Sequence, residues 1–394
     1  MPAKQPKIQD ESIKSLSAEL TGWLTQNALP TWQKNGLDNT KGECFEAIDL
    51  DTGRATTSPR RARVVPRQIY SFLEGEKLGW NGPGREIAIS LLDWYLATYL
   101  TKEGFIAAAA DLDNRIVDDS FDLYNQAFAL FSFAQIAKFL PERREQAIEA
   151  ASNLINYLFD NYRHPEAGFR EANPDKAPLC SNPHMHLFEA CLAWEETSDD
   201  TVWPDLADEL AELALSRFID PVTGGLREFF ALDWSPMPGD KGKVIEPGHQ
   251  FEWAWLLARW GHDRGDAGAL IAARRLYDIG WTYGINESRG VAFMSLKDDF
   301  TVRDPIARLW GQTEWIKAAV ALAQISTGVE RSAYLSDIPD AVLALQTYFR
   351  DVPAGLWRDK LAPDGTFAEE PAPASSLYHI VCAIAELHAF AEVL

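Results

Sequence analysis

Apolar residues recur along this chain at i, i+3, i+4 and i+7, the spacing that gathers them on one face of an amphipathic helix. Start signals accompany the pattern: Asp119-Ser120 precedes the fourth helix, Pro141-Glu142 opens the fifth and Pro204 lies in the first turn of the seventh. Alternating stretches at 226–234 and 292–296 predict short hairpin strands between helix pairs. The pattern predicts twelve helices, at about 12–27, 67–79, 85–102, 121–139, 143–162, 184–196, 202–218, 249–264, 267–283, 306–326, 331–349 and 376–391.

A glycine followed closely by an aromatic or apolar residue recurs six times, at intervals of 57 to 65 residues. The six positions are Gly42, Gly104, Gly168, Gly225, Gly290 and Gly355. A fixed period indicates repeated units that stack on their neighbours to bury a core. Six helix pairs closed into a ring predict an all-α (α/α)6 barrel with short β-hairpins between the pairs. An all-α protein without a closed ring is the alternative.

Composition narrows the class of protein. The even repeat, with no Ser/Gly-rich or Pro-rich linker, predicts one domain over residues 1–394, although length alone suggests two or three. No signal peptide or membrane span is expected, and four scattered cysteines without CxxC spacing predict a reduced, cytoplasmic protein. The net charge of −21 argues against a nucleic-acid partner and polyanionic substrates. A monomer and a homodimer both agree with the sequence.

Each repeat places a chemically notable residue 18 to 25 positions after its glycine, near the start of the first helix of a pair. In a closed barrel, these six starts lie on one rim and point inward. The repeat therefore predicts that residues far apart in the chain meet at one site. They are Arg67, Tyr124, His186, His249, Trp310 and His379.

Two histidines are the strongest candidates for chemistry. His249 follows a Pro-Gly break that starts a helix, and Glu252, three residues later, shares its face and is expected to orient the ring or set its pKa. His379 lies in the first turns of the last helix. Both are predicted to work as acid–base groups at the rim.

The remaining histidines divide into one further candidate and four others. His184 and His186 form an H-x-H pair, and on a helix the two side chains point about 200° apart, so only one faces the site. We favour His186, which Asn182 and Glu189 flank. A zinc site is the weaker alternative, since HExxH and any Cys/His cluster with ligand spacing are missing. His164, His262 and His388 are expected to be structural or exposed.

The predicted rim suits a sugar. Aromatic faces pack on pyranose C–H surfaces, and two histidines suit proton transfer at a carbon next to a carbonyl. GxGxxG, Walker and GxSxG motifs are missing, which argues against nucleotide and serine-hydrolase chemistry, and no cofactor is predicted. A glycosidase needs two carboxylates across the scissile bond, and nothing singles out a pair among the candidates Glu171, Glu228, Glu252 and Glu314.

Six ordered segments, which cover the chain from about residue 40 to its end, resemble the N-acylglucosamine 2-epimerase superfamily. Within it the chain looks most similar to the D-mannose isomerase branch, which includes the sulfoquinovose isomerases. The segments are Arg63-Val-Val-Pro-Arg67-Gln-Ile-Tyr-Ser-Phe72, Asp122-Leu-Tyr-Asn-Gln-Ala-Phe128, Asn182-Pro-His-Met-His186-Leu-Phe-Glu-Ala190, Pro247-Gly-His249-Gln-Phe-Glu252-Trp253, Trp310-Gly-Gln-Thr-Glu314 and Tyr378-His379.

The resemblance implies a metal-free isomerase that converts D-mannose to D-fructose. It implies that His249, paired with Glu252, moves a proton between C1 and C2 through a cis-enediol, and that His379 assists ring opening. The two histidine roles are open to reversal. Arg67 would stabilise the enediolate oxygen. The residues implied to bind hydroxyls or pack on the ring are Tyr124, Asn182, His186, Trp310 and Glu314.

Other functions share this pattern. A 2-epimerase acting on mannose/glucose, an N-acylhexosamine or a cellobiose-type disaccharide has most of the same site, although the Ser-Ser-Leu-Tyr stretch before His379 favours an isomerase. A sulfoquinovose-type isomerase, an inverting glycosidase and a non-enzymatic binding protein are further alternatives. A 6-phosphate or 6-sulfonate would need a basic subsite, for which Arg170, Lys176 and Arg308 are candidates.

Overall fold

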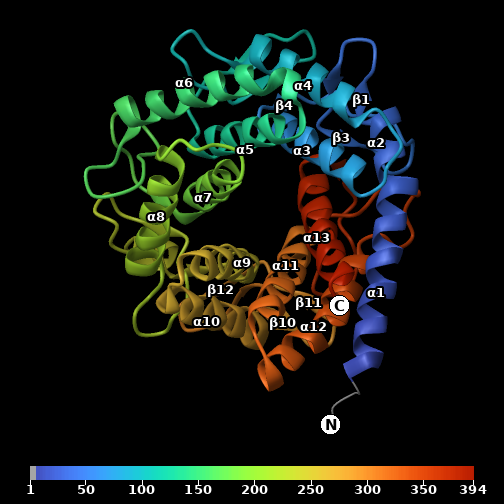
Figure 1. Ribbon diagram of the computed structural model, residues 1–394, viewed down its shortest axis with the longest axis vertical. Coiled ribbons are helices and arrows are strands. Elements are labelled where there is room, and N and C mark those ends of the chain that lie inside the picture. Colours follow the sequence, from blue (N-terminus) through green and yellow to red (C-terminus); the bar gives the residue numbers. More distant parts are fainter. Residues whose placement is uncertain (1–5) are drawn as a thin grey trace.

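The computed structural model describes residues 6–394, and twelve long helical segments within them form a ring of six pairs (Figure 1). The first outer segment runs from α1 through a π-helical stretch, Leu24–Ala28, into α2 (Leu29–Asn35). The inner helices are α3 (Val64–Lys77), α5 (Leu123–Phe139), α7 (Ser181–Glu195), α9 (Pro247–Arg264), α11 (Leu309–Ile325) and α13 (Ser375–Glu392). The outer helices are α1 (Pro6–Trp23), α4 (Gly84–Tyr99), α6 (Arg144–Tyr162), α8 (Val202–Leu213), α10 (Ala267–Gly284) and α12 (Gly328–Thr347).

The ring of inner helices is closed. Each inner helix contacts the next one around the ring, and α13 contacts α3 to complete it. Each outer helix packs mainly on one inner helix, and the last pair joins α13 to α1, so the first and last helices of residues 6–394 lie side by side (Figure 1). The predicted closed barrel of helix pairs is confirmed. No helix within residues 6–394 is long and apolar enough to cross a membrane.

Burial explains the two rings. The inner helices α5 and α11 are buried on nearly every face, since they lie between the barrel axis and the outer ring. The outer helix α8 buries one stripe, as an amphipathic helix does. Apolar residues on all sides of α5 therefore reflect its place inside the double ring.

Three predicted helix bounds need correction. The fourth helix begins after Asp122, whose carboxylate accepts from the backbone N–H of Tyr124, and not after Asp119-Ser120. The first helical segment extends to Asn35 because the chain continues through the π-helical stretch. Residues 306–308 are not helical, since Ala307–Arg308 form strand β14 and pair with β15.

The recurring glycines close the turn that follows each outer helix. Gly42, Gly104, Gly168, Gly290 and Gly355 all have positive φ, a conformation that glycine adopts without a steric penalty. In the fourth unit the positive-φ residue is Gly224, at +77°, so the predicted Gly225 is one position too late.

Side chains of the inner helices hold these turns in place. In three units a glutamine amide accepts from a backbone N–H of the turn and donates to the carbonyl of the same residue. In the third unit, a histidine ring accepts from that N–H instead. The pairs are Gln126 with Ile106, Gln250 with Leu226, Gln312 with Ala292 and His184 with Phe169. Each brace fixes the start of an inner helix.

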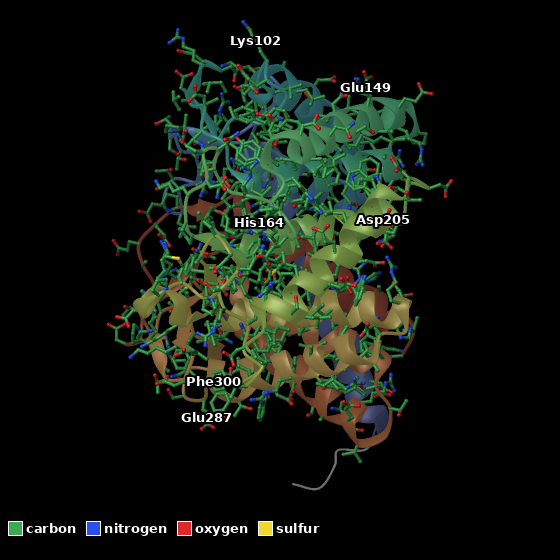
Figure 2. All side chains as sticks on the ribbon, turned by 90° about the vertical axis from the view of Figure 1, so that its left-hand side faces the viewer. Lys102, Glu149, His164, Asp205, Glu287 and Phe300 are labelled. Atoms are coloured by element: carbon green, nitrogen blue, oxygen red, sulfur yellow. The ribbon has the colours of Figure 1, made fainter. Side chains whose placement is uncertain are left out.

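Short antiparallel strands cover the end of the barrel where the inner helices begin. Five strands that lead into an inner helix (β4, β7, β9, β14 and β16) each pair with a strand after the neighbouring outer helix, and β16 with β3 joins the two chain ends. Figure 2 shows Glu287 and Phe300 of these hairpins toward one end and Asp205 of an outer helix toward the other. The strands are β1 (Leu37–Asp38), β2 (Glu43–Cys44), β3 (Ala47–Ile48), β4 (Arg60–Arg61), β5 (Ala109–Ala110), β6 (Ile116–Asp118), β7 (Leu179–Cys180), β8 (Phe229–Phe230), β9 (Val244–Ile245), β10 (Ile285–Asn286), β11 (Val291–Ala292), β12 (Ser295–Lys297), β13 (Val302–Asp304), β14 (Ala307–Arg308), β15 (Lys360–Leu361) and β16 (Ala372–Pro373).

Candidate active site

A cavity of about 270 Å³ lies where the six inner helices begin. Its volume lies just under the roughly 300–1,000 Å³ typical of drug-sized ligands and suits a monosaccharide. Glu314, the ninth residue predicted for the site, does not line it. The predicted residues that do are Arg67, Tyr124, Asn182, His186, His249, Glu252, Trp310 and His379.

His249 is held by carboxylates that the sequence analysis did not assign to it. Its Nδ1 lies 2.9 Å from Glu228 Oε2 and 3.4 Å from Glu246 Oε2. Glu252, which was expected to orient the ring or set its pKa, makes no hydrogen bond to His249, but it lines the same cavity and its charge adds to those that raise the pKa of His249. Glu228, which directly precedes strand β8, reaches His249 from the hairpin, whereas Glu252 lies deeper along α9 and comes within 3.6 Å of the ammonium group of Lys317.

His379 is held in a matching way by Glu314. Its Nδ1 lies 2.9 Å from Glu314 Oε1, and the other oxygen of this carboxylate is 2.5 Å from Lys317 Nζ. Glu314 is fully buried behind the histidine. Glu314 was expected to bind sugar hydroxyls; the structure instead places it against His379 and outside the lining of the cavity.

These contacts engage Nδ1 of both rings. An ionised carboxylate only accepts hydrogen bonds, so Nδ1–H is the donor to it; burial and the charge of Glu252 raise the pKa of Glu314, and the ammonium group of Lys317 opposes that shift. Nε2, on the opposite side of each imidazole, is then left for a bound substrate. Both rings lie near Trp310, whose ring centroid is 4.9 Å from that of His249 and 6.1 Å from that of His379.

The surroundings push the pKa values of the two histidines in opposite directions. Burial alone would lower the pKa of His249, but the charges of Glu228 and Glu246 outweigh it and raise that pKa above its ordinary value. Burial, reinforced by the positive charges of Arg67 and Lys317, lowers the pKa of His379 well below 6.5. His249 therefore keeps a second proton at neutral pH and His379 does not. Two titratable groups whose pKa values are shifted apart in this way are typical of a general acid and a general base in one active site.

The H-x-H pair separates as predicted. His184 points away from the cavity, where its ring nitrogens contact the Cys180 carbonyl and the Phe169 N–H. His186 lines the cavity, and its Nδ1 lies 3.1 Å from Glu189 Oε2. Glu189 also accepts from the Tyr378 hydroxyl.

Two of the remaining histidines behave as expected. Away from the cavity, the buried His164 is braced by the Leu232 carbonyl and the Trp234 indole, so it is structural. His262 is exposed.

Arg67 supplies positive charge to the cavity. Its guanidinium donates to the Tyr124 hydroxyl and, at 3.4 Å, to the Ser375 carbonyl. It lies 4.2 Å from the ring centroid of Phe128. Among residues 6–394 no carboxylate forms an ion pair with Arg67, so its charge is available to an anionic oxygen of a substrate.

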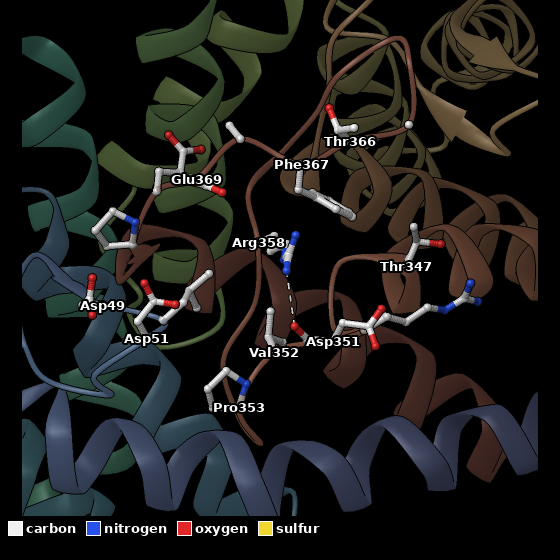
Figure 3. A pocket seen from close by; sticks show the side chains of 16 residues that line it. Asp49, Asp51, Thr347, Asp351, Val352, Pro353, Arg358, Thr366, Phe367 and Glu369 are labelled. Carbon is white, nitrogen blue, oxygen red and sulfur yellow. Dashed lines mark hydrogen bonds between the residues drawn. The ribbon is translucent and has the colours of Figure 1, made fainter.

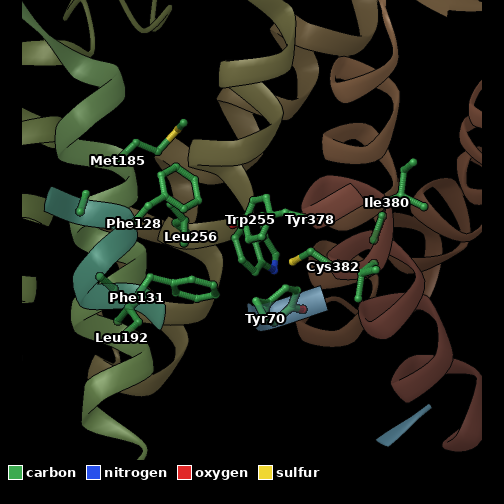
Figure 4. Packing of buried hydrophobic residues seen from close by; sticks show 14 of the residues in the cluster. Tyr70, Phe128, Phe131, Met185, Leu192, Trp255, Leu256, Tyr378, Ile380 and Cys382 are labelled. Atoms are coloured by element: carbon green, nitrogen blue, oxygen red, sulfur yellow. The ribbon is translucent and has the colours of Figure 1, made fainter. Parts of the chain in front are cut away.

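Packed aromatic side chains lie below the catalytic groups. Tyr70, Phe128, Phe131 and Tyr378 meet with ring centroids 5.3 to 6.5 Å apart, and Trp255 lies near them (Figure 4). Tyr70, Phe131 and Trp255 also line another cavity of about 270 Å³. This aromatic cluster therefore lies between that cavity and the candidate active site.

Two clusters of side chains have the donor types of a metal site. They are His186 with Glu189 and Glu252, and Glu252 with Glu314 and His379. In both clusters the histidine Nδ1 is already bound to a carboxylate. Lys317 Nζ lies 2.5 Å from Glu314 and 3.6 Å from Glu252, so this lysine supplies the positive charge between the two carboxylates.

A larger cavity of about 860 Å³ lies elsewhere, between the 49–51 turn and residues 347–371 (Figure 3). Arg358 in its wall donates to the Asp351 carbonyl. Carboxylates and arginines line it without a histidine or a tryptophan. It lacks the acid–base pair that distinguishes the smaller cavity.

The family model of N-acylglucosamine 2-epimerase (GlcNAc 2-epimerase) matches residues 44–383. The chain belongs to the N-acylglucosamine 2-epimerase family. This confirms the resemblance seen in the sequence. The matched range begins in strand β2 and ends within α13, so it covers most of the segment from about residue 40 to the end of the chain.

Similar proteins in this family include isomerases. A mannose-6-phosphate isomerase of Rhizobium meliloti (strain 1021) is 50% identical over 373 residues, which cover 94% of this chain and 96% of that protein. A D-mannose isomerase of Thermobifida fusca is 27% identical, with coverage of 69% and 70%. The cellobiose 2-epimerase structure from Bacillus thermoamylovorans B4167 superposes with a TM-score of 0.84 at 17% identity, covering 96% of this chain and all of that one. The predicted reaction class, a sugar isomerase, is confirmed.

Sequence reasoning missed Glu246 and Lys317, and it considered Glu228 only as a possible glycosidase carboxylate. Glu228 follows the fourth recurring glycine by a few positions, and Glu246 precedes His249 by three. The spacing of Glu246 to His249 and of Glu314 to Lys317 is i, i+3, which places side chains on one helix face. This spacing could have revealed the Glu246–His249 and Glu314–Lys317 pairs. The contact of Glu228 with His249 could not be predicted, because it depends on the path of the hairpin.

Proposed function

We propose that this chain interconverts D-mannose and D-fructose by proton transfer between C2 and C1, without a metal ion. The observation that carries the proposal is the pair His249 and His379: both lie near Trp310, each is held by its own carboxylate, and at neutral pH His249 is protonated whereas His379 is neutral. The proposal treats residues 1–394 as one catalytic domain. The 27% identical D-mannose isomerase supports the choice of sugar.

His379 acts as the base in this proposal. A neutral imidazole with Nδ1–H held by Glu314 presents the Nε2 lone pair, which removes the C2 proton of the open-chain aldose. The electron pair moves onto the C1 carbonyl oxygen to give a cis-enediolate, and Arg67 stabilises the negative oxygen. Return of the proton to C1 then gives the ketose. This reverses the histidine roles that the sequence resemblance implied, because His249 is the protonated member of the pair.

His249 acts as the acid. Its imidazolium, held by Glu228 and Glu246, donates a proton to the ring oxygen during opening and exchanges protons with O1 and O2 as the enediol forms and collapses. Trp310 packs on the sugar between the two histidines. Tyr124, Asn182 and His186 bind hydroxyls from the opposite side of the cavity.

D-mannose 6-phosphate is a second candidate substrate. Arginines 61, 63 and 308 line the rim of the cavity, and the 50% identical relative is named a mannose-6-phosphate isomerase. Each arginine is bound by one carboxylate, and Arg308 holds Asp359 through Nε and Nη2. Arg170, another residue considered for such a subsite, pairs with Asp175 and does not line the cavity.

The substrate is tested by product analysis. Purified protein is incubated separately with D-mannose and D-mannose 6-phosphate, and kcat/KM is compared for the two sugars. Fructose from mannose, with the higher kcat/KM, supports the proposal. A tenfold or larger preference for the phosphorylated sugar would replace it with the second candidate, and glucose as the product would make the protein a 2-epimerase.

A broad pH profile is expected for kcat/KM. Activity falls at low pH as His379 takes up a proton, and its lowered pKa places this limb below 6.5. Activity falls at high pH as His249 loses its proton, and its raised pKa places that limb above the usual histidine range. The plateau therefore spans neutral pH. A narrow bell centred near pH 6.5 would contradict the charge assignment.

Chelation is expected to leave the activity unchanged. The proton transfers described above use only side chains of this chain, and Lys317 already provides the positive charge among the buried carboxylates. Activity is measured after prolonged incubation with EDTA and desalting. Loss of activity that Zn²⁺, Mn²⁺ or Co²⁺ restores would show that the reaction needs a metal ion.

A further inference from the structure

Lys317 lies in an unusual place for a lysine. It is fully buried on α11, and its ammonium group is 2.5 Å from Glu314, 3.6 Å from Glu252 and 3.9 Å from the ring centroid of Trp255. Burying an ammonium ion costs several kcal/mol unless close opposite charges offset the loss of hydration, and apolar side chains often fill such a site with equal or better stability. Its contact with Glu314, the carboxylate that holds His379, points to a role in the reaction.

A single side chain, that of Glu314, connects Lys317 to His379. Glu314 binds Lys317 with one carboxylate oxygen and His379 Nδ1 with the other. Glu252 has no hydrogen-bond donor on either oxygen among residues 6–394. The positive charge near it is that of Lys317, with His186 Nδ1 farther away at 3.9 Å. Without the ammonium ion, two buried carboxylates would face His379 with little compensation.

We propose that Lys317 is a positioning residue for catalysis, whose buried ammonium group anchors Glu314 against His379 Nδ1 and keeps the His379 imidazole neutral. This inference rests on the proposed function of His379 as the base. The ammonium ion offsets the carboxylates that would otherwise draw a proton onto His379. The groups that face this centre from the surrounding elements are Arg67 on α3, His186 and Glu189 on α7, Glu252 on α9, Glu314 on α11, Arg308 on β14, and Tyr378 and Cys382 on α13 itself.

The charge of Lys317 is tested with Lys317→Met, which keeps an unbranched side chain of similar length without the charge. The acid limb of kcat/KM is expected to move up by about one pH unit or more, since an adjacent charge typically shifts a pKa by 1–3 units. Below the limb, a one-unit shift lowers the rate about tenfold. An unchanged acid limb in a folded Lys317→Met protein would overturn the proposal and leave Lys317 a structural role.

Removing the negative charge of Glu314, alone or together with the positive charge of Lys317, gives the variants that are matched to Lys317→Met. Glu314→Gln keeps a carbonyl acceptor for His379 but removes one negative charge, so its acid limb is expected to move to lower pH. The double variant Lys317→Met/Glu314→Gln is expected to return the limb toward its original position. Glu314→Gln remains informative if Lys317→Met does not fold, because an acid limb that stays in place in this variant also contradicts the proposal.

A readout without turnover separates this inference from the choice of substrate. The protein is labelled with ¹³C at histidine Cε1, the His379 signal is identified by its loss in His379→Gln, and its pH titration is followed by NMR. A His379 titration that moves up in Lys317→Met supports the role of Lys317 even if mannose is not converted. A titration identical to that of the unmodified protein overturns it.

Discussion

Replacing His379 with glutamine is expected to lower kcat by about 10²–10⁴-fold, the range for loss of a positioned general base. Glutamine has no basic nitrogen, so nothing at this position removes the C2 proton. The measurement is initial-rate kinetics with D-mannose across pH. The remaining activity should lack the acid limb, because the group that titrates there is gone.

The matched control for this variant is His388→Gln. His388 lies on the same helix, α13, away from the cavity, and near-unchanged kinetics are expected. A circular dichroism spectrum and a melting temperature close to those of the unmodified protein show that the barrel is intact. Wild-type activity in a folded His379→Gln protein would remove His379 from the mechanism.

His249→Gln is expected to lose activity on a similar scale, about 10²–10⁴-fold in kcat, through loss of the general acid. The amide cannot donate a proton to the ring oxygen and regain it within the catalytic cycle. The distinguishing readout is the alkaline limb of the pH profile, which should disappear in this variant while the acid limb of His379 stays. Opposite limb losses in the two variants would assign the acid and the base separately.

His262→Gln serves as the control on the same helix, α9, where His262 is exposed. Its kinetics should match those of the unmodified protein. If His249→Gln retains full activity, the carboxylates Glu228 and Glu246 have no catalytic partner, and the proposed acid must be sought among other residues of the cavity. If His249→Gln loses the acid limb instead, the two histidine roles are the reverse of those proposed.

The recurring glycines were enough to predict the closed barrel and the end of it at which the site lies. A glycine in every unit meant that the same turn preceded each inner helix, and the structure has positive φ at five of the six predicted glycines. Equivalent turns gave equivalent helix starts, so Arg67, His249 and His379 could be placed on one rim without any contact being known. The neighbouring position, Gly224, takes this role in the fourth unit because the turn is shifted by one residue.

Contacts that depend on side-chain direction could not be predicted in the same way. Helical periodicity placed Glu252 on the face of His249, and both line the cavity, but Glu252 lies within 3.6 Å of the Lys317 ammonium group and makes no hydrogen bond to His249. The hairpin before β8 instead brings Glu228 to His249, and the path of that hairpin depends on its pairing with β7. Glu314 was expected to line the cavity because it lies four residues after Trp310 on the same helix. In the structure it is fully buried and contacts His379, and the sequence does not reveal this direction of its side chain.

The measurement that tests the central claim most directly is an NMR time course of EDTA-treated protein with D-mannose in D₂O. Fructose is expected to appear, and deuterium is expected to enter only at the carbons between which the proton moves, C1 and C2. Glucose labelled at C2 would contradict the isomerase and indicate a 2-epimerase on the same barrel. Mannose that stays unchanged and unlabelled would contradict proton transfer from this sugar altogether.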